Sequence, residues 1–265
     1  MKRLAVLYRT SVGKKIVAAL TGMLLIAFLL MHAVGNLSVF SGTDAGGTPY
    51  IDLYAAFLAG LGGPLLPERA FLWAFRLGLM AVLLLHLWSV ITLARENRAA
   101  RPLAYAKKLR VGSSVAAAWM LWSGLFLVLF IIVHLANLLL GRLSPSPYQA
   151  GAVYANLYHI FAVWYLALFY LAAMAALALH LYHGVWSLFQ TLGIDRPGRN
   201  RMLRRVAVLT TLLVVGTFTT VPLSFLSGRM EAPSTLAAQA RVSHDQHGAV
   251  VGLPPIANGA AAREG

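Results

Sequence analysis

The chain of 265 residues contains no cysteine. It can therefore form no disulfide, attach no haem covalently as c-type cytochromes do, and bind no iron–sulfur cluster through thiolates of its own. Any iron–sulfur cluster that works together with this chain would belong to a partner chain. Acidic residues are also scarce, with 8 Asp and Glu against 22 Lys and Arg, and only 11% of residues are charged. Soluble domains average about 25% charged residues, so this composition indicates an integral membrane protein.

Five long apolar runs make up most of the sequence, which is 59% hydrophobic with a mean hydropathy of +0.73. A helix needs about 20 apolar residues to cross a bilayer. We expect spans near residues 16–40, 70–94, 113–140, 155–190 and 205–227. The fourth is over-long, so its first turns should lie at the membrane interface. The first run exceeds signal-peptide length and lacks a convincing cleavage site. The predicted fold is an all-α, five-helix membrane bundle.

Basic residues gather in alternate connections, namely before the first run, between the second and third, and between the fourth and fifth. They are Lys2, Arg3, Arg9, Lys14, Lys15, Arg95, Arg98, Arg101, Lys107, Lys108, Arg110, Arg196, Arg199, Arg201, Arg204 and Arg205. The other connections carry only Arg69, beside Glu68, and Arg142. This positive-inside pattern predicts a cytoplasmic N-terminus and an outer C-terminus. It explains the net charge of +14 without nucleic acid, and the basic face can also meet anionic membrane lipid.

Two segments outside the apolar runs differ from them in composition. We treat residues 1–227 as one membrane domain and residues 228–265 as a tail. The tail holds Pro, Ser, Gln, Gly and Ala without helical periodicity, so we expect it to be extended or disordered on the outer side. Residues 41–68 form a predicted Gly/Pro-rich outer loop, with a short amphipathic helix in YIDLYAAFLAGL.

Of the eight histidines, His159 sits near the outer start of the fourth predicted span, and five lie deeper inside the spans: His32, His86, His134, His180 and His183. An imidazole in hydrocarbon is costly unless something binds it, so each is a candidate functional residue. At 1.5 Å per residue, the flanking charges place His32 and His134 toward the outer side. They place His86 and His180 toward the inner side. Each of these two pairs combines histidines from two different helices.

Two histidine pairs at two depths suit two b-type haems. Haem b takes two axial imidazoles on opposite faces at one level, which a helical bundle can supply. The ordinary alternative is a histidine that bonds between helices, and four histidines on four helices favour haem. A di-metal site is disfavoured, because no Asp or Glu lies well inside a span. Nearby glycines would let a flat macrocycle approach, although small residues also serve helix packing. They are Gly22, Gly78, Gly124 and Gly184.

Three segments carry distinctive motifs: SVGKK before the first span, HAVGNLSVF around His32 and LHLYHGVWSLFQTLG around His180. Together they resemble the membrane cytochrome b subunit of succinate dehydrogenase and fumarate reductase, in its single-polypeptide, five-helix form with two b haems. The resemblance covers about residues 10–228. It implies iron ligands on the first four helices, with the fourth-span ligand four residues before a glycine. Gly184 makes that ligand His180.

The resemblance implies His86 and His180 as ligands of the inner haem iron, and His32 and His134 as ligands of the outer one. A flavoprotein would oxidise succinate, and an iron–sulfur subunit would pass the electrons through these haems to a membrane quinone, expected to be menaquinone. The chain would then anchor respiratory complex II, which serves the tricarboxylic acid cycle, in a bacterial cytoplasmic membrane. No residue of this chain would act on succinate. Some fumarate-reducing members carry a glutamate where this chain has Ala178, so we expect succinate oxidation.

Two further residues are predicted to serve the site. Arg76 lies inside the second span, and we expect it to bind a propionate of the outer haem, with snorkelling to the interface as the alternative. His183 is expected to contact a propionate or a quinone, or simply to pack. Lys14, Lys15 and Ser11 would line an inner quinone site, or the two lysines would only anchor the topology.

Other functions remain open at this point. The chain could be the haem-b quinone subunit of another respiratory dehydrogenase, of the hydrogenase or formate dehydrogenase kind, or a haem-poor quinone-binding anchor. A proton-coupled transporter with a histidine relay is disfavoured, because transporters usually place acidic groups at mid-membrane.

Overall fold

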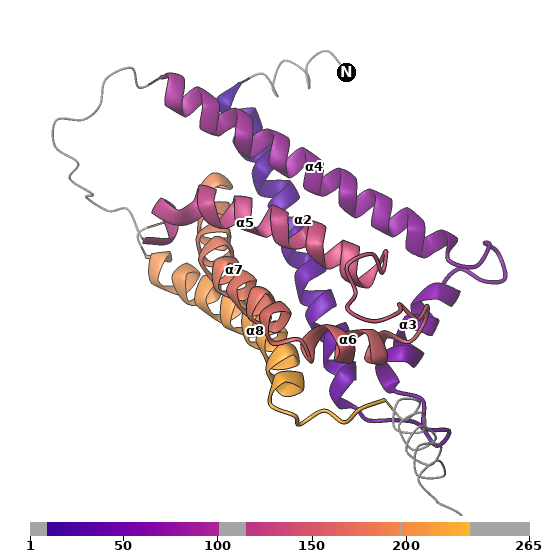
Figure 1. Ribbon diagram of the computed structural model, residues 1–265. Coiled ribbons are helices and arrows are strands. Elements are labelled where there is room, and N and C mark those ends of the chain that lie inside the picture. The colour runs from indigo at the N-terminus through magenta and orange to yellow at the C-terminus, as the bar shows by residue number, and fades with distance from the viewer. Residues whose placement is uncertain (1–9, 101–114, 197, 234–265) are drawn as a thin grey trace, which may run out of the picture.

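The computed structural model describes residues 10–100, 115–196 and 198–233, and the regular elements in these ranges are helices (Figure 1). In chain order they are α2 (Ser11–Leu37), the short 3₁₀ turn η1 (Ser38–Phe40), α3 (Tyr50–Gly60), α4 (Ala70–Ala99), α5 (Val115–Leu138), α6 (Val153–Phe161), α7 (Trp164–Thr191) and α8 (Asn200–Leu226). Helices α2, α4, α5, α7 and α8 are long and apolar enough to cross a membrane. The chain is an all-α, multi-pass membrane protein, as its composition predicts.

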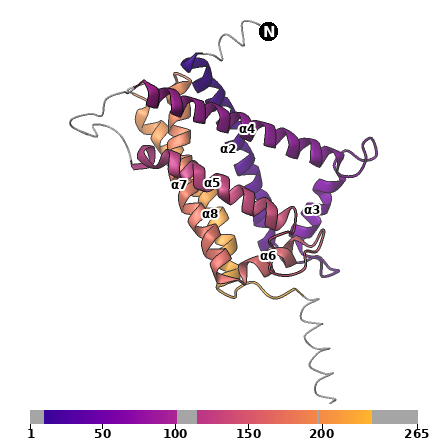
Figure 2. The same ribbon diagram turned by 45° about the horizontal axis from the view of Figure 1, so that its top comes forward.

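The predicted spans match these five helices, with one correction. The run 155–190 is not a single helix, because Val163 adopts an extended conformation (φ −90°, ψ 105°) that separates α6 from α7. Helix α6 lies across the ends of α7 and α8 (Figures 1 and 2). The helix expected in residues 50–61 is present as α3. The predictions for residues 1–9, 101–114 and most of the tail, 234–265, lie outside the described residues.

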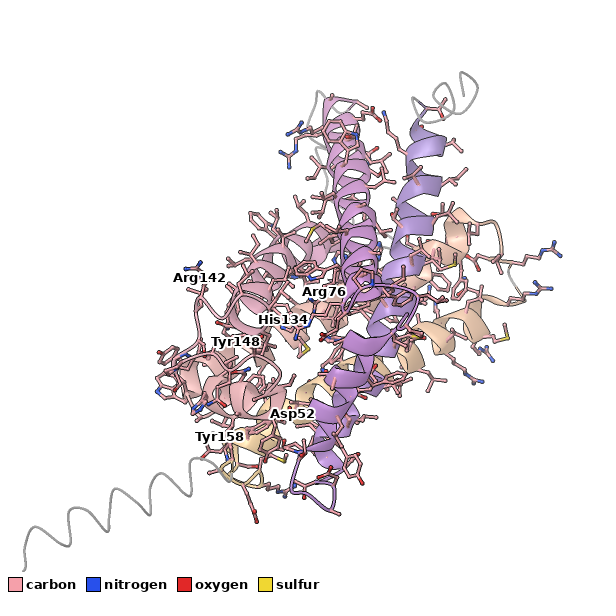
Figure 3. The ribbon with its side chains drawn as sticks, turned by 90° about the vertical axis from the view of Figure 1, so that its right-hand side faces the viewer. Asp52, Arg76, His134, Arg142, Tyr148 and Tyr158 are labelled. Atoms are coloured by element: carbon pink, nitrogen blue, oxygen red, sulfur yellow. The ribbon has the colours of Figure 1, made fainter. Side chains whose placement is uncertain are left out.

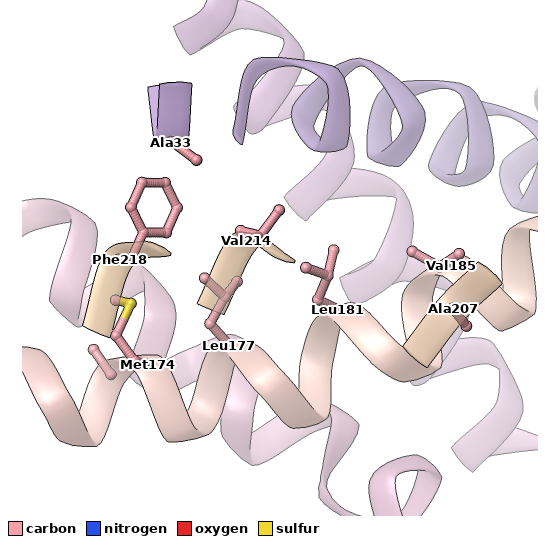
Figure 4. Close-up of a cluster of buried hydrophobic side chains, with 9 residues drawn as sticks. Ala33, Met174, Leu177, Leu181, Val185, Ala207, Val214 and Phe218 are labelled. Atoms are coloured by element: carbon pink, nitrogen blue, oxygen red, sulfur yellow. The ribbon is translucent and has the colours of Figure 1, made fainter. Parts of the chain in front are cut away.

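Helices α7 and α8 form the core of the bundle, with α2 against both (Figure 4). Buried side chains recur every three or four residues along α7, as expected for one helical face. Ala173 of α7 and Ala207 of α8 are fully buried, and such small residues let helix backbones approach closely. The cluster consists of Ala33, Ala173, Met174, Leu177, Leu181, Val185, Ala207, Val214 and Phe218.

The remaining spans, α4 and α5, each pack against one of these helices: α4 packs against α2, and α5 packs against α7. We call the end where α2, α5 and α8 begin, and where α4 and α7 end, the basic end. Its described basic residues are Lys14, Lys15, Arg95, Arg98, Arg196, Arg199, Arg201, Arg204 and Arg205. Lys14 is buried and forms an ion pair with Glu96, which joins the start of α2 to the last turns of α4. This contact favours a structural role for Lys14.

The opposite end is closed by α3 and α6, which lie side by side (Figure 2). Apolar residues of η1, α3 and α6 pack there against the ends of α7 and α8. Asp52 of α3 accepts the backbone N–H of Tyr154 at 2.9 Å. The residue that precedes α6, Ala152, offers no side-chain cap. Asp52 therefore caps α6 from another helix, which satisfies a donor that a helix N-terminus leaves unpaired.

The charge on Asp52 makes this cap dependent on pH. Burial raises the pKa of the Asp52 carboxyl, while the N–H groups of Val153 and Tyr154 act in the opposite sense. The folded chain therefore binds this proton more tightly than the unfolded chain. The stability contributed by the group is complete below its unfolded pKa and falls as pH rises through its folded pKa.

We expect Asp52→Asn to keep the cap and Asp52→Ala to lose it. Asparagine retains an acceptor oxygen without a charge to bury, so at pH 7 α6 should be at least as stable as in the parent chain, an advantage that shrinks toward pH 4. Loss of a cap costs about 1 kcal/mol, so alanine should accelerate amide hydrogen exchange at residues 153–156 about fivefold. Exchange in the asparagine variant as fast as in the alanine variant would contradict this role.

Candidate functional site

His86 of α4 is held by α2. Its Nδ1 lies 3.1 Å from the Thr21 hydroxyl oxygen and 3.2 Å from the Ala18 carbonyl oxygen. The ring also lies against Gly22, where an added Cβ would come 3.4 Å from the His86 Cε1 atom. Because one ring nitrogen is occupied by α2, the other nitrogen, Nε2, is left to bind something else.

His180 of α7 is held by α5 in a similar way. Its Nδ1 lies 3.4 Å from the Ser123 hydroxyl oxygen, and the Met120 backbone also forms a hydrogen bond with the ring. A Cβ added at Gly124 would come 3.2 Å from the His180 Cε1 atom. Of the four glycines expected to admit a macrocycle, Gly22 and Gly124 thus lie against imidazole rings. The other two, Gly78 and Gly184, have no atom within 4 Å of an added Cβ.

The two rings just described form an inner pair. His86 and His180 lie within electrostatic range of each other, although they stand on different helix pairs. The glycine beside an inner ring gives the level of that ring along the bundle. His86 lies beside Gly22 of α2, and His32 follows Gly22 by ten residues on the same helix (32 − 22). Ten helical residues rise about 15 Å. The inner pair is therefore separated by roughly that distance from the level of His32.

His32 and His134 form an outer pair. Their ring centroids are 6.1 Å apart, with the ring planes at 82°. His134 follows Gly124 by ten residues (134 − 124), so both outer rings lie the same number of residues beyond the inner level. Aromatic rings surround the pair. They are Phe28, Phe130, Tyr170 and Phe218.

The outer pair has an unpaired polar atom. His134 Nδ1 is buried and has no hydrogen-bond partner among the described residues. One turn along α5, Asn137 is fully buried, its amide nitrogen lies 3.5 Å from the Tyr170 hydroxyl, and its Oδ1 is also unpaired within the described chain. A buried polar group without a partner costs about 1–3 kcal/mol. These atoms mark a place where a further polar partner would be stabilising.

This donor set fits haem b better than a bare metal ion. Within the described residues, no group of three or more His, Asp or Glu side chains could hold an ion. A haem iron needs only two protein ligands, because the porphyrin supplies the other four. Metal–imidazole bonds are about 2 Å long, so imidazoles on opposite sides of one iron have centroids about 6 Å apart. The 6.1 Å spacing of the outer pair fits this requirement.

Arg76 lies on α4 in the half nearer the opposite end (Figure 3). Its guanidinium carbon stands 5.1 Å from the centroid of the Trp73 ring, and Tyr148 lies nearby. Among the described residues no carboxylate pairs with it. The guanidinium is half-buried and keeps donors for an anionic group, as a propionate contact would require.

His183 is half-buried on α7, within electrostatic range of His180. It forms no hydrogen bond within the described chain, unlike His180, whose Nδ1 is held by α5. The two histidines are three residues apart and point about 60° apart around the helix. Only His180 therefore presents a ring that a second helix has oriented.

Sequence reasoning missed the residues that hold the inner rings. Thr21 and Ser123 are small, common residues, and nothing in their own neighbourhood marks them. One signal was available: each stands directly before a glycine that precedes a histidine by ten residues. Asp52, which caps α6, gave no signal because its partner lies 102 residues away.

Comparisons of the chain with protein families, with curated proteins and with solved structures find no match. The function proposed below rests on the residues of this chain and their geometry.

Proposed function

We propose that this chain is the membrane-anchoring, electron-transferring subunit of a succinate:quinone oxidoreductase. His86 and His180 would bind one b haem and His32 and His134 a second. The observation that carries the proposal is the pairing of four histidines at two levels, about 15 Å apart, on four helices. The resemblance of three segments to the cytochrome b subunit of this enzyme class supports the choice of partner reaction.

The chain's own task is to hold and orient imidazoles. In the inner pair, contacts at Nδ1 leave Nε2 as the coordinating nitrogen. In the outer pair, the aromatic shell excludes water and fixes the rings. Bound haem b supplies reversible one-electron chemistry at these positions. Arg76 would neutralise a propionate near the outer pair.

Two haems at these positions would act as two successive electron carriers across the bilayer. Electrons would enter at the basic end, which is cytoplasmic by the positive-inside pattern, from an iron–sulfur subunit that a succinate-oxidising flavoprotein reduces. A membrane quinone, expected to be menaquinone, would accept them. Movement of one charge across the membrane couples to about 2.3 kcal/mol per 100 mV. The setting is a bacterial cytoplasmic membrane.

The test is purification of the chain from its native membrane. We expect a pyridine haemochrome assay to give two haems per polypeptide, and a flavoprotein and an iron–sulfur protein to copurify with succinate:quinone reductase activity. Two haems with a hydrogenase or formate dehydrogenase as the copurifying partner would indicate another respiratory dehydrogenase. A haem content near zero would reduce the chain to an anchor and overturn the electron-transfer role.

A further inference from the structure

The inner histidines are held by one short pattern that occurs twice. In each case one helix contributes three groups that contact the ring. They are a backbone carbonyl four residues before a glycine, a side-chain hydroxyl one residue before that glycine, and the glycine itself, which lies against the ring. On α2 the three are Ala18, Thr21 and Gly22, and on α5 they are Met120, Ser123 and Gly124. The ring comes from the next membrane-spanning helix in both cases, α4 for α2 and α7 for α5.

The hydrogen bonds fix which nitrogen carries the proton at His86. The Thr21 hydroxyl donates to the Val17 carbonyl at 2.7 Å, so its oxygen is free to accept. The Ala18 carbonyl can only accept. Both acceptors face Nδ1, at 3.1 and 3.2 Å. Nδ1 is therefore the protonated nitrogen, and Nε2 carries the lone pair.

The same reasoning applies to His180. The Ser123 hydroxyl donates to the Met120 carbonyl at 3.2 Å and faces His180 Nδ1 at 3.4 Å with its oxygen. The Met120 backbone also accepts from the ring. The longer distance makes the serine contact the weaker of the two. Thr21 and Ser123 are both buried, so no bulk water replaces either contact.

We propose that Thr21 and Ser123 are positioning residues, which orient the two inner histidines and set their electron-donating strength toward a bound haem iron. The proposal rests on the haem ligation proposed above. A hydrogen-bond acceptor at Nδ1–H raises the basicity of the imidazole and fixes its orientation. A more basic imidazole stabilises the oxidised iron more than the reduced iron. The two hydroxyls therefore hold the inner midpoint potential low relative to one without them.

The first experiment measures the midpoint potentials of both haems in the purified complex. Thr21→Val removes the hydroxyl at nearly constant shape and should make the inner potential more positive. Hydrogen-bond partners of metal-ligating side chains alter metal affinity about 10–100-fold, and a tenfold change in the ratio of oxidised to reduced affinity equals about 59 mV for one electron. We expect tens of millivolts for Thr21→Val, less for Ser123→Ala, and no change in the outer haem.

The controls separate positioning from packing. Thr21→Ser and Ser123→Thr keep the hydroxyl and should keep the parent potential. Thr211→Val removes a buried hydroxyl that bonds the carbonyl four residues earlier on α8, as Thr21 does on α2, but that contacts no histidine. It should leave both potentials unchanged. An inner potential unaltered by Thr21→Val, or shifted equally by Thr211→Val, would overturn the proposal.

A second measurement does not depend on haem. In the full chain without haem, ¹⁵N spectra of histidine side chains should show His86 with the proton on Nδ1. Because the Ala18 carbonyl still accepts from Nδ1–H, Thr21→Val should keep this tautomer but move the Nδ1 signal as one hydrogen bond is lost, and Thr211→Val should not move it. If the chain binds no haem yet shows this shift, the electron-transfer function fails while the positioning role stands. If haem binds and neither readout moves, the positioning role fails alone.

Discussion

Replacement of His180 by alanine is expected to remove one haem and leave the other spectrally intact, while replacement of His183 removes none. The two side chains lie three residues apart and point about 60° apart around α7, so one iron cannot take both as opposing ligands. His180 has its Nδ1 bound by α5 and lies within electrostatic range of His86. His183 has neither an orienting contact from a second helix nor a paired histidine of its own among the described residues.

The measurement is haem content per polypeptide together with the reduced-minus-oxidised spectrum of each variant. His180→Ala should fall from two haems to one, and His183→Ala should stay at two, with at most slower quinone turnover. The two variants control for each other, because both remove an imidazole from the same turns of α7. Haem loss in His183→Ala with retention in His180→Ala would invert the assignment.

Replacement of His134 by alanine should remove the outer haem and spare the inner one. His134 is half-buried with its Nδ1 atom enclosed, and its ring centroid lies 6.1 Å from that of His32. Its nearest rings, Phe130 and Tyr170, offer no nitrogen that could substitute as an iron ligand. Loss of the imidazole therefore leaves the iron with one protein ligand, and bis-histidine coordination at that level is lost.

His159→Ala is the matched control for this variant. His159 lies on α6 near the same end of the bundle and its ring contacts only Tyr158 among the described aromatic residues. We expect two haems in the His159 variant and one in the His134 variant, with the remaining haem still reduced by succinate in the assembled complex. Equal haem loss in both would indicate general unfolding of that end of the bundle. Two haems in the His134 variant would contradict the outer pair.

Hydropathy and charge were sufficient to predict the membrane-spanning architecture. A bilayer demands about 20 apolar residues per helix and concentrates basic residues on one side. Both are properties of contiguous sequence, so they can be read without knowing which helices touch. The break between α6 and α7 was harder to place, because Val163 is an unremarkable residue in an apolar run. The start of α6 was equally hard to place, because it is capped by Asp52 from a helix distant in sequence.

The candidate site also has features that the sequence determines and features that only the tertiary structure determines. Sequence alone determined which histidines lie in apolar spans and, through the constant helical rise, their relative depths. It could not determine which helices pack together, since packing depends on small and aliphatic side chains such as Ala173 and Ala207, which look alike in every span. Only the tertiary structure decided that α2 holds His86 and α5 holds His180. The physical reason is that a hydrogen bond between helices requires two particular faces to meet, and hydrophobic burial, which drives the helices into the membrane, has no direction of its own.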